Sequence, residues 1–256
     1  MDNNLYNEYA SYYAAITNDR DIEGQLNCIL DTFDPQYPCE SVLELFAGQA
    51  WHSIFAQKRN INAWAADASM GMKGLAISDG FQKTEQYIVG ALPSSILDTN
   101  DLPKFDLVLC LYHGLSNLTR PQVYELLDNL KLLIKPHGKV VIELHNIHYA
   151  MRYVAEPLIK FFEVTGRAGE IITYAWPGGK IVWSPESHTA EVPITCIVRD
   201  GKKVQKLDFT SIDHLYSAED ISFMANLLGY VVRVRSNDYN WQKQFDNSVV
   251  LELTLR

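Results

Sequence analysis

The sequence predicts an α/β fold with a seven-stranded, mostly parallel sheet and helices on both faces. Two observations carry this prediction. Short apolar runs alternate with helix-like segments from residue 41 to residue 144, and the same alternation returns after residue 217. Strands separated by helices in this way usually pair in parallel, because each helix carries the chain back to the edge of the sheet where the next strand begins.

The seven expected strands are short and apolar. They span Ser41–Ala47, Ala63–Ala66, Tyr87–Val89, Phe105–Leu111, Lys139–Leu144, Tyr230–Val234 and Ser248–Leu255. The expected helices between them span Trp51–Lys58, Met70–Phe81, Arg120–Leu133 and Ser217–Leu228. The third of these helices runs into Lys135-Pro136-His137-Gly138, and proline and glycine at that point are typical of a helix end.

Two segments stand outside this alternation. Residues 5–33 favour helix and carry four tyrosines at helical spacing (Tyr6, Tyr9, Tyr12 and Tyr13), which predicts a helical cap over residues 1–35. Residues 165–216 predict an antiparallel β insert that forms a lid. Its first hairpin would pair residues 171–176 with 180–183, and its second would pair 195–199 with 204–209 around Asp200-Gly201. The whole chain, residues 1–256, is expected to form a single domain.

The composition argues against several classes of protein. The net charge of −9 disfavours broad contact with a nucleic-acid backbone, and no apolar run approaches the roughly 20 residues of a membrane span. The four cysteines are scattered without a CxxC pair, and no third ligand accompanies His145 and His148, so neither a disulfide nor a metal site is expected. The first residues do not resemble a secretory signal, which favours the cytoplasm.

One strand end carries the pattern of a nucleoside site. Glu44-Leu-Phe-Ala-Gly-Gln-Ala50 follows the first expected strand and opens onto a helix, and its small residues allow the backbone to approach a ligand closely. Asp67 ends the second strand, where a carboxylate can accept both hydroxyls of a ribose. The GxGxxG pyrophosphate fingerprint is absent. The pattern therefore favours a cofactor that has a ribose and no pyrophosphate.

Three stretches then resemble one family. ELFAGQAWHS and AADASMGM are similar to the first motif and the acidic follower of Rossmann-like class I S-adenosylmethionine-dependent methyltransferases. Residues 105–118 and 135–146 resemble the fourth- and fifth-strand motifs of the glycine N-methyltransferase-like branch. The resemblance covers nearly the whole chain in order, and it implies S-adenosylmethionine as cofactor.

The resemblance also implies which residues bind that cofactor. Glu44 and the turn through Gly48 would border its methionine part, Asp67 would hold the ribose, and Tyr13 and Arg20 would bind the carboxylate. The full expected set is Tyr13, Arg20, Glu44, Phe46, Ala47, Gly48, Asp67, Ala68, Met72, Ala91, Leu92, Leu111 and Tyr112. The chain departs from the family at three places: Ala50 replaces a frequent glycine, Trp51 replaces a frequent arginine, and Gly90-Ala91-Leu92 lacks the acidic residue near the adenine amine.

Methyl transfer is an in-line displacement in which alignment supplies most of the acceleration, so a general base is useful but optional. His113, at the end of the fourth strand, is the first candidate base. His145 ends the fifth strand, two residues after Glu143, which could orient its ring because both lie on one face. Candidate substrate contacts are Tyr12, His113, Asn146, Trp176, Trp183 and His188. Asp106 is instead expected to support the start of its strand.

The sequence thus predicts methyl transfer to an amine nitrogen of a small molecule or peptide, by a monomer or homodimer. Transfer to a hydroxyl or carboxylate by the same fold stays open, as does a non-catalytic module that binds S-adenosylmethionine. Methylation of a nucleic acid is disfavoured, because Leu111-Tyr112-His113-Gly114 stands where the Asn/Asp-Pro-Pro-Tyr motif would follow the fourth strand.

Overall fold

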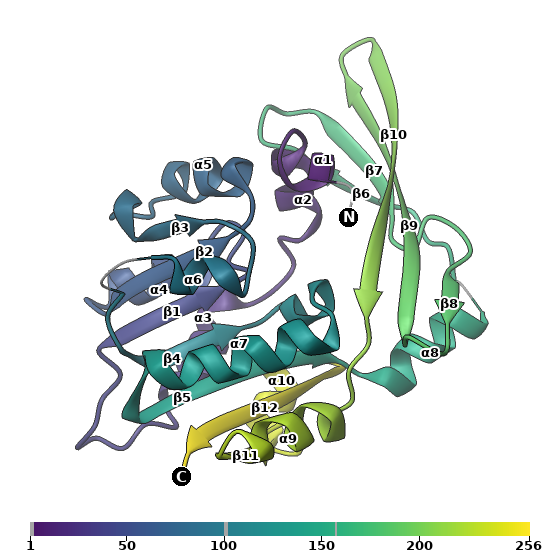
Figure 1. Cartoon of the computed structure of the whole chain (residues 1–256). Coiled ribbons are helices and arrows are strands. Elements are labelled where there is room, and N and C mark those ends of the chain that lie inside the picture. The colour runs from purple at the N-terminus through teal and green to yellow at the C-terminus, as the bar shows by residue number, and fades with distance from the viewer. Residues whose placement is uncertain (1–2, 100–101, 157) are drawn as a thin grey trace. The chain divides into compact units, whose positions relative to one another are not determined.

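A computed structural model describes residues 3–99, 102–156 and 158–256, and the chain falls into two compact units (Figure 1). We call Asp21–Asn146 with Tyr216–Arg256 the sheet unit, and Met1–Arg20 with Ile147–Leu215 the insert unit. No helix within the described stretches is long and apolar enough to cross a membrane.

The sheet unit contains the expected seven-stranded sheet, in the order β11-β12-β5-β4-β1-β2-β3. Its strands are β1 (Ser41–Leu45), β2 (Asn62–Asp67), β3 (Tyr87–Val89), β4 (Phe105–Cys110), β5 (Ile134–His145), β11 (Tyr230–Val234) and β12 (Ser248–Leu255). The five strands from β1 to β5 pair in parallel, and β12 pairs antiparallel with both β5 and β11. The sequence prediction of a seven-stranded, mostly parallel sheet is confirmed.

Helices cover both faces of this sheet, because side chains along each strand alternate between two apolar cores. On β1, Leu43 and Leu45 enter one core while Val42 enters the other. Helices α6 (Ser94–Leu97), α7 (Arg120–Leu133) and α9 (Ala218–Leu227) supply the first core, and α3 (Ile22–Leu30), α4 (Trp51–Lys58) and α10 (Tyr239–Gln244) supply the second. Helix α5 (Met70–Ser78) packs near β2 and β3.

The chain order reverses at β1, which has β2 on one side and β4 on the other. The registers bring Leu45 opposite both Ala66 of β2 and Cys110 of β4, so the carboxyl ends of the three strands meet at one edge. Such a reversal is where open α/β sheets bind ligands. The sequence motifs around Gly48, Asp67 and Tyr112 all fall at this edge.

The insert unit contains a five-stranded sheet in the order β10-β9-β7-β6, with β8 also paired to β9, all antiparallel. Its strands are β6 (Phe162–Thr165), β7 (Ile171–Ala175), β8 (Val182–Ser184), β9 (Thr189–Asp200) and β10 (Lys203–His214), and its helices are α1 (Asn3–Tyr6), α2 (Ala10–Ile16) and α8 (Ile147–Ala155). The predicted hairpin around Asp200-Gly201 is confirmed and is longer than expected, with twelve paired residues on each strand. Gly201 has φ +55°, which a tight hairpin turn requires.

The other predicted hairpin, between residues 171–176 and 180–183, is wrong. Strands β7 and β8 do not pair with each other: Ala175 lies opposite Thr195, and Val182 lies opposite Glu191, so both strands use the same edge of β9. Strand β9 has twelve residues, so it is long enough to pair with β7 and β8 one after the other. In the segment between β7 and β8, Gly178 N donates to the carbonyl oxygen of Pro193 at 2.7 Å. Pro193 lies on β9 and, as a proline, has no N–H to donate in return.

The helical N-terminal stretch expected over residues 5–33 is interrupted. Helix α2 ends at Ile16, and α3 begins anew at Ile22 with Asp21 as its cap, whose Oδ1 accepts from Gly24 N at 2.9 Å. Thr17, Asn18 and Asp19 lie between them, and such side chains compete with helical backbone hydrogen bonds. As a result α1 and α2 belong to the insert unit and α3 to the sheet unit.

Candidate active site

The turn between β1 and α4 has an unusual backbone. Phe46, Gly48 and Ala50 have φ values of 52°, 51° and 55°, and only one of the three is a glycine. A non-glycine residue in this region is strained, and such strain persists only where surrounding contacts fix it. The sequence indicated small residues here, but it did not indicate that Phe46 and Ala50 adopt left-handed backbone.

Asp67 fixes this turn from the end of β2. Its Oδ2 accepts from Gly48 N at 2.8 Å and its Oδ1 accepts from Ser69 N at 2.9 Å. Burial raises the pKa of Asp67 above its usual value, although both amide donors favour the charged form. Each carboxylate oxygen can accept a second hydrogen bond, so the group retains capacity for a ligand with two hydroxyls.

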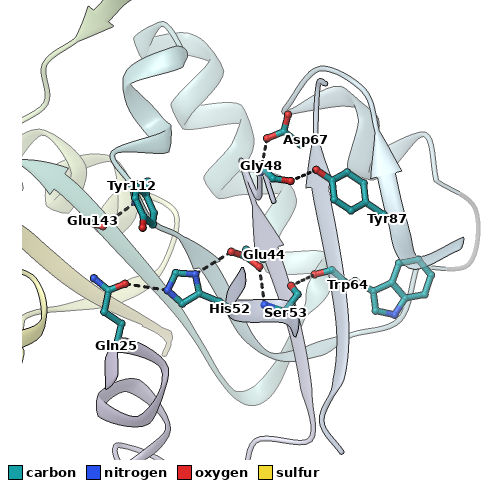
Figure 2. Close-up of polar contacts among 10 residues, drawn as sticks. All are labelled: Gln25, Glu44, Gly48, His52, Ser53, Trp64, Asp67, Tyr87, Tyr112 and Glu143. Atoms are coloured by element: carbon teal, nitrogen blue, oxygen red, sulfur yellow. Dashed lines mark hydrogen bonds and ion pairs between the residues drawn. The ribbon is translucent and has the colours of Figure 1, made fainter. Parts of the chain in front are cut away.

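Tyr87 holds the same turn through the carbonyl of Gly48, as Figure 2 shows. Its buried hydroxyl donates to Gly48 O, so both backbone groups of Gly48 are engaged by side chains from neighbouring strands. Burial raises the pKa of Tyr87, which keeps the hydroxyl protonated as a donor. Buried Met72 lies beside Gly48 as well, since a Cβ added to that glycine would be 3.9 Å from its sulfur.

Ser95, in the segment after β3, carries a hydroxyl close to Gly90-Ala91-Leu92, where the methyltransferases that the sequence resembles have an acidic residue. Gly90 N donates to Asp67 O at 3.0 Å, and a Cβ on Gly90 would lie 2.6 Å from Cβ of Ser95. The Ser95 hydroxyl is buried, and it has no hydrogen-bond partner among the residues that the structure describes. Leu92 is buried nearby in sequence, while Ala91 is exposed. The sequence gave no signal that singled out Ser95.

Glu44 is turned toward α4. Its Oε1 lies 3.0 Å from His52 Nδ1, and its Oε2 accepts from Ser53 N at 2.8 Å (Figure 2). His52 Nε2 in turn lies 3.1 Å from Oε1 of Gln25 on α3. Glu44 was expected to border the methionine part of a cofactor, and the structure places both of its oxygens in contacts with α4. Neither His52 nor Gln25 was singled out by the sequence.

The three predicted catalytic residues lie together at the ends of β4 and β5. Glu143 is fully buried, and its Oε2 accepts from Tyr112 N at 2.8 Å. His113 Nε2 lies 3.5 Å from Glu143 Oε1, and the rings of His113 and His145 stack with centroids 3.8 Å apart. The carboxylate, proposed as a partner of His145, therefore lies beside His113.

Ser248 completes this cluster from β12. Its hydroxyl donates to Glu143 Oε1 at 2.7 Å and lies 3.2 Å from His113 Nε2. Since that hydroxyl proton points at the carboxylate, the serine oxygen can accept from Nε2–H of the ring. This arrangement favours the tautomer of His113 with its hydrogen on Nε2. Ser248 is 105 residues from Glu143, and no local sequence pattern connects them.

The two turns meet through Phe46. A Cβ added to Gly114 would lie 2.5 Å from the Phe46 ring, so the ring packs directly on this glycine. Tyr112 and His113, just before it, both have left-handed backbone with φ of 51° and 56°. The strained turn after β1 and the strained turn after β4 are therefore in direct contact.

The other expected residues belong to the insert unit or to its junctions. Tyr13 lies 6.3 Å from Trp176, measured between ring centroids, and Trp183 lies 6.0 Å from His188. Trp176 joins the two aromatic groups, because it also packs with Trp183 around Ile181, Ala190 and Val192. Tyr12 stacks on Tyr9, and burial raises its pKa. Arg20 and Asn146 are the residues at which the chain passes between the units.

Asp106 has the structural role predicted for it. Its Oδ2 accepts from Glu40 N at 3.0 Å, Ser41 Oγ at 2.7 Å and Lys135 Nζ at 2.8 Å, at the amino ends of the strands. No cluster of three or more metal-binding side chains occurs in the parts of the chain that the structure describes.

Comparison with known proteins shows the fold. No family model matches the chain, and no curated protein matches it. Among solved structures, DesVI from Streptomyces venezuelae has a TM-score of 0.75 at 15% identity, with 97% of each chain covered. The sugar N-methyltransferase KedS8 from a Streptoalloteichus species has a TM-score of 0.74 at 14% identity, covering 97% of this chain and 92% of its own.

A third structure contains the cofactor. The amino pentose methyltransferase CalS10 from Micromonospora echinaspora, solved with S-adenosylmethionine bound, has a TM-score of 0.71 at 12% identity, with 97% of each chain covered. The chain has the class I fold of S-adenosylmethionine-dependent methyltransferases, over nearly its full length.

Proposed function

We propose that this protein is an S-adenosylmethionine-dependent methyltransferase that acts on an amine nitrogen of a small molecule or peptide. The observation that carries the proposal is the turn after β1, whose central glycine is held by Asp67 through its N–H and by Tyr87 through its carbonyl. This turn lies at the switch point of a sheet with the methyltransferase fold.

The residues present fit this cofactor. The carboxylate of Asp67 suits two ribose hydroxyls. The hydroxyl of Ser95, which has no hydrogen-bond partner within residues 3–99, 102–156 and 158–256, suits the polar edge of an adenine. Met72 and Leu92 supply apolar surface, while the turn through Phe46, Ala47 and Gly48 would border the methionine part. The remaining positions carried over from the resemblance are Tyr13, Arg20, Glu44, Ala68, Ala91, Leu111 and Tyr112. When bound, the cofactor supplies a methyl group on a sulfonium.

His113 is proposed as the group that receives a proton from the acceptor. An amine attacks only in its neutral form, and amines are mostly protonated at neutral pH. The side chain of His113 is 21% exposed, and its Nε2 faces Ser248 and Glu143. The buried carboxylate of Glu143 stabilises the imidazolium that forms. The ring of His145 stacks on that of His113.

An amine is favoured over a hydroxyl acceptor by the similar structures. Two of the similar structures are a sugar N-methyltransferase and an amino pentose methyltransferase. We further propose that the substrate is neither nucleic acid nor lipid membrane, and that a monomer or homodimer acts in the cytoplasm. Transfer to oxygen and a non-catalytic binding module are the rival proposals.

Calorimetric titration with S-adenosylmethionine tests the cofactor. Wild-type protein is expected to bind it in the micromolar range, and Asp67→Ala is expected to weaken binding by about 1–3 kcal/mol, the cost of an unmade buried hydrogen bond. Asp106→Asn is the control, because it removes a half-buried, hydrogen-bonded carboxylate at the opposite end of the strands. A folded wild-type protein that does not bind would contradict the proposal.

A screen of amine and hydroxyl acceptors then tests the chemistry. Methylated product would be detected by mass spectrometry, with matched pairs of compounds that differ only in an amino or hydroxyl group. Turnover of amines alone supports nitrogen transfer, and turnover of the hydroxyl partners alone would move the proposal to oxygen. Binding of cofactor without turnover of any acceptor would favour the non-catalytic module.

A further inference from the structure

His52 is enclosed in the sheet unit, with 1% of its surface exposed. It lies on the first turn of α4, between Glu44 at the end of β1 and Gln25 on α3 (Figure 2). Both ring nitrogens are within hydrogen-bond distance of these partners, at 3.0 and 3.1 Å. Because both ring nitrogens are engaged, His52 could hydrogen-bond to a ligand only by losing the contact with Glu44 or with Gln25. Any effect of His52 on a ligand is therefore transmitted through these neighbouring residues.

The orientation of the Gln25 side chain determines whether its amide nitrogen or its amide oxygen faces His52. Nε2 of Gln25 donates to the main-chain oxygen of Gln244 at 2.9 Å, which turns the amide oxygen toward His52. The carboxylate of Glu44 also offers only acceptors. Both contacts are satisfied together when the ring carries a hydrogen on each nitrogen, as an imidazolium.

Glu44 is a suitable counterion for that ring. Its other oxygen accepts from Ser53 N at the amino end of α4, where the helix dipole favours negative charge. The N-cap of α4 is Ala50, which has no side chain that can accept a hydrogen bond. Glu44 therefore caps the helix from β1, and this contact spans the turn that contains Phe46 and Gly48.

We propose that His52 is a positioning residue of the cofactor site. As an imidazolium paired with Glu44 and tied to α3 through Gln25, it holds the turn between β1 and α4 in the shape that receives the cofactor. This inference rests on the proposed function. It assigns a role to a buried histidine that touches neither acceptor nor cofactor, and it explains why the strained backbone of the turn persists without a capping side chain of its own.

Nitrogen NMR of the histidine side chains tests the charge state in the protein without ligand. His52, assigned by its loss in His52→Asn, is expected to show two protonated ring nitrogens and two hydrogens that exchange slowly. A single protonated nitrogen would overturn the ion pair. The exposed His137 provides a reference ring that exchanges quickly with water.

Calorimetry with S-adenosylmethionine tests the positioning role. His52→Leu removes both bonds of the ring and is expected to weaken binding about 30- to 100-fold. His52→Asn and Gln25→Leu each remove one of the two contacts of His52 and are expected to weaken binding about threefold to tenfold, although Gln25→Leu also loses the bond to the Gln244 main chain. The two milder variants keep the test informative if His52→Leu does not fold. If His52→Asn binds S-adenosylmethionine more tightly than His52→Leu, the hydrogen bond that asparagine keeps, and not only the volume of the side chain at residue 52, contributes to binding.

The control is a variant that loses stability elsewhere in the same unit. Glu252 on β12 forms a buried ion pair with Arg235, and strands β5 and β4 separate β12 from β1 in the sheet order. Glu252→Gln is expected to unfold at a lower temperature and to bind S-adenosylmethionine as tightly as the wild type. If His52→Asn, Gln25→Leu and a folded His52→Leu all bind within twofold of the wild type, this inference is overturned and the proposed function stands. A wild-type protein that does not bind would overturn both.

Discussion

Two buried glutamates, Glu44 and Glu143, stand at the carboxyl ends of β1 and β5, and each has a histidine beside it. The histidine of the first pair has 1% of its side chain exposed and is enclosed by acceptors. The histidine of the second has 21% exposed, and one of its nitrogens faces Ser248 and Glu143. Tyr112 lies between the pairs: its N–H donates to Glu143, and its ring lies 6.5 Å from that of His52.

The difference shows how the same two side chains support different tasks. A carboxylate and a histidine that engage only protein groups fix the backbone around them, as at Glu44. A pair whose histidine is partly exposed can exchange a proton with a bound molecule, as at Glu143. Solvent access decides which role a buried Glu–His pair can take, and it predicts different kinetic effects for substitutions at the two glutamates.

The largest expected effect is on turnover, from Glu143→Gln. The amide keeps the volume of the side chain but removes the charge that stabilises protonated His113. We expect kcat to fall about 10²–10⁴-fold, the usual contribution of a general base, with an unchanged dissociation constant for S-adenosylmethionine. Steady-state product formation and calorimetry measure the two quantities. Equal loss of cofactor affinity with unchanged kcat would contradict the assignment of Glu143 to the acceptor side.

Glu44→Gln is the matched substitution at the other pair. It places an amide N–H against either His52 or the Ser53 N–H, so one donor faces another. We expect the dissociation constant for S-adenosylmethionine to rise about tenfold, with kcat nearly unchanged once the cofactor is saturating. The comparison fails if this variant loses turnover at saturating cofactor as severely as Glu143→Gln does.

The sequence predicted the sheet and its helices because those depend on local patterns: short apolar runs that alternate with helix-like segments, and proline or glycine after a helix. It failed at the first hairpin of the insert, since a local pattern marks β7 and β8 as strands but does not name β9 as the partner of both. At the candidate site, Asp67 was singled out because its spacing from Glu44 matches the motif of the family that the sequence resembles. Tyr87 and Ser248 were missed because their partners are 39 and 105 residues away. The left-handed backbone of Phe46 and Tyr112 was also invisible, because neither is a glycine.

Gly114→Ala tests whether the two strained turns depend on each other. Its Cβ would lie 2.5 Å from the Phe46 ring, which must then move away from its position over the turn after β4. We expect the free energy of unfolding to fall by about 1–3 kcal/mol, as in other overpacked cores, together with weaker cofactor binding and slower turnover. Urea denaturation, calorimetry and product assays measure the three effects.

Gly74→Ala is the control for that substitution. It lies within α5, and a Cβ there would meet no heavy atom within 4 Å. The variant is expected to be as stable as the wild type or more so by about 0.5–1 kcal/mol, because alanine favours helix. If Gly114→Ala leaves both binding and turnover intact, the turns are independent, and the two glutamates can be treated as separate sites.

A small effect, on stability alone, is expected at Asp106. This carboxylate pairs with Lys135 rather than with a histidine, and it lies at the amino ends of the strands. Burial alone would raise the pKa of Asp106, but hydrogen bonds from Lys135, Ser41 and the Glu40 amide together lower it. A lowered folded-state pKa means that the carboxylate stabilises the fold above its unfolded pKa, about 3.9, and that this contribution is lost as the pH falls through the folded value. Asp106→Asn should therefore lower the free energy of unfolding by about 1 kcal/mol at pH 7. The gap between variant and wild type should shrink below about pH 4 in urea denaturation, and a gap that stays constant with pH would show that the charge contributes nothing beyond the hydrogen bonds an amide can keep.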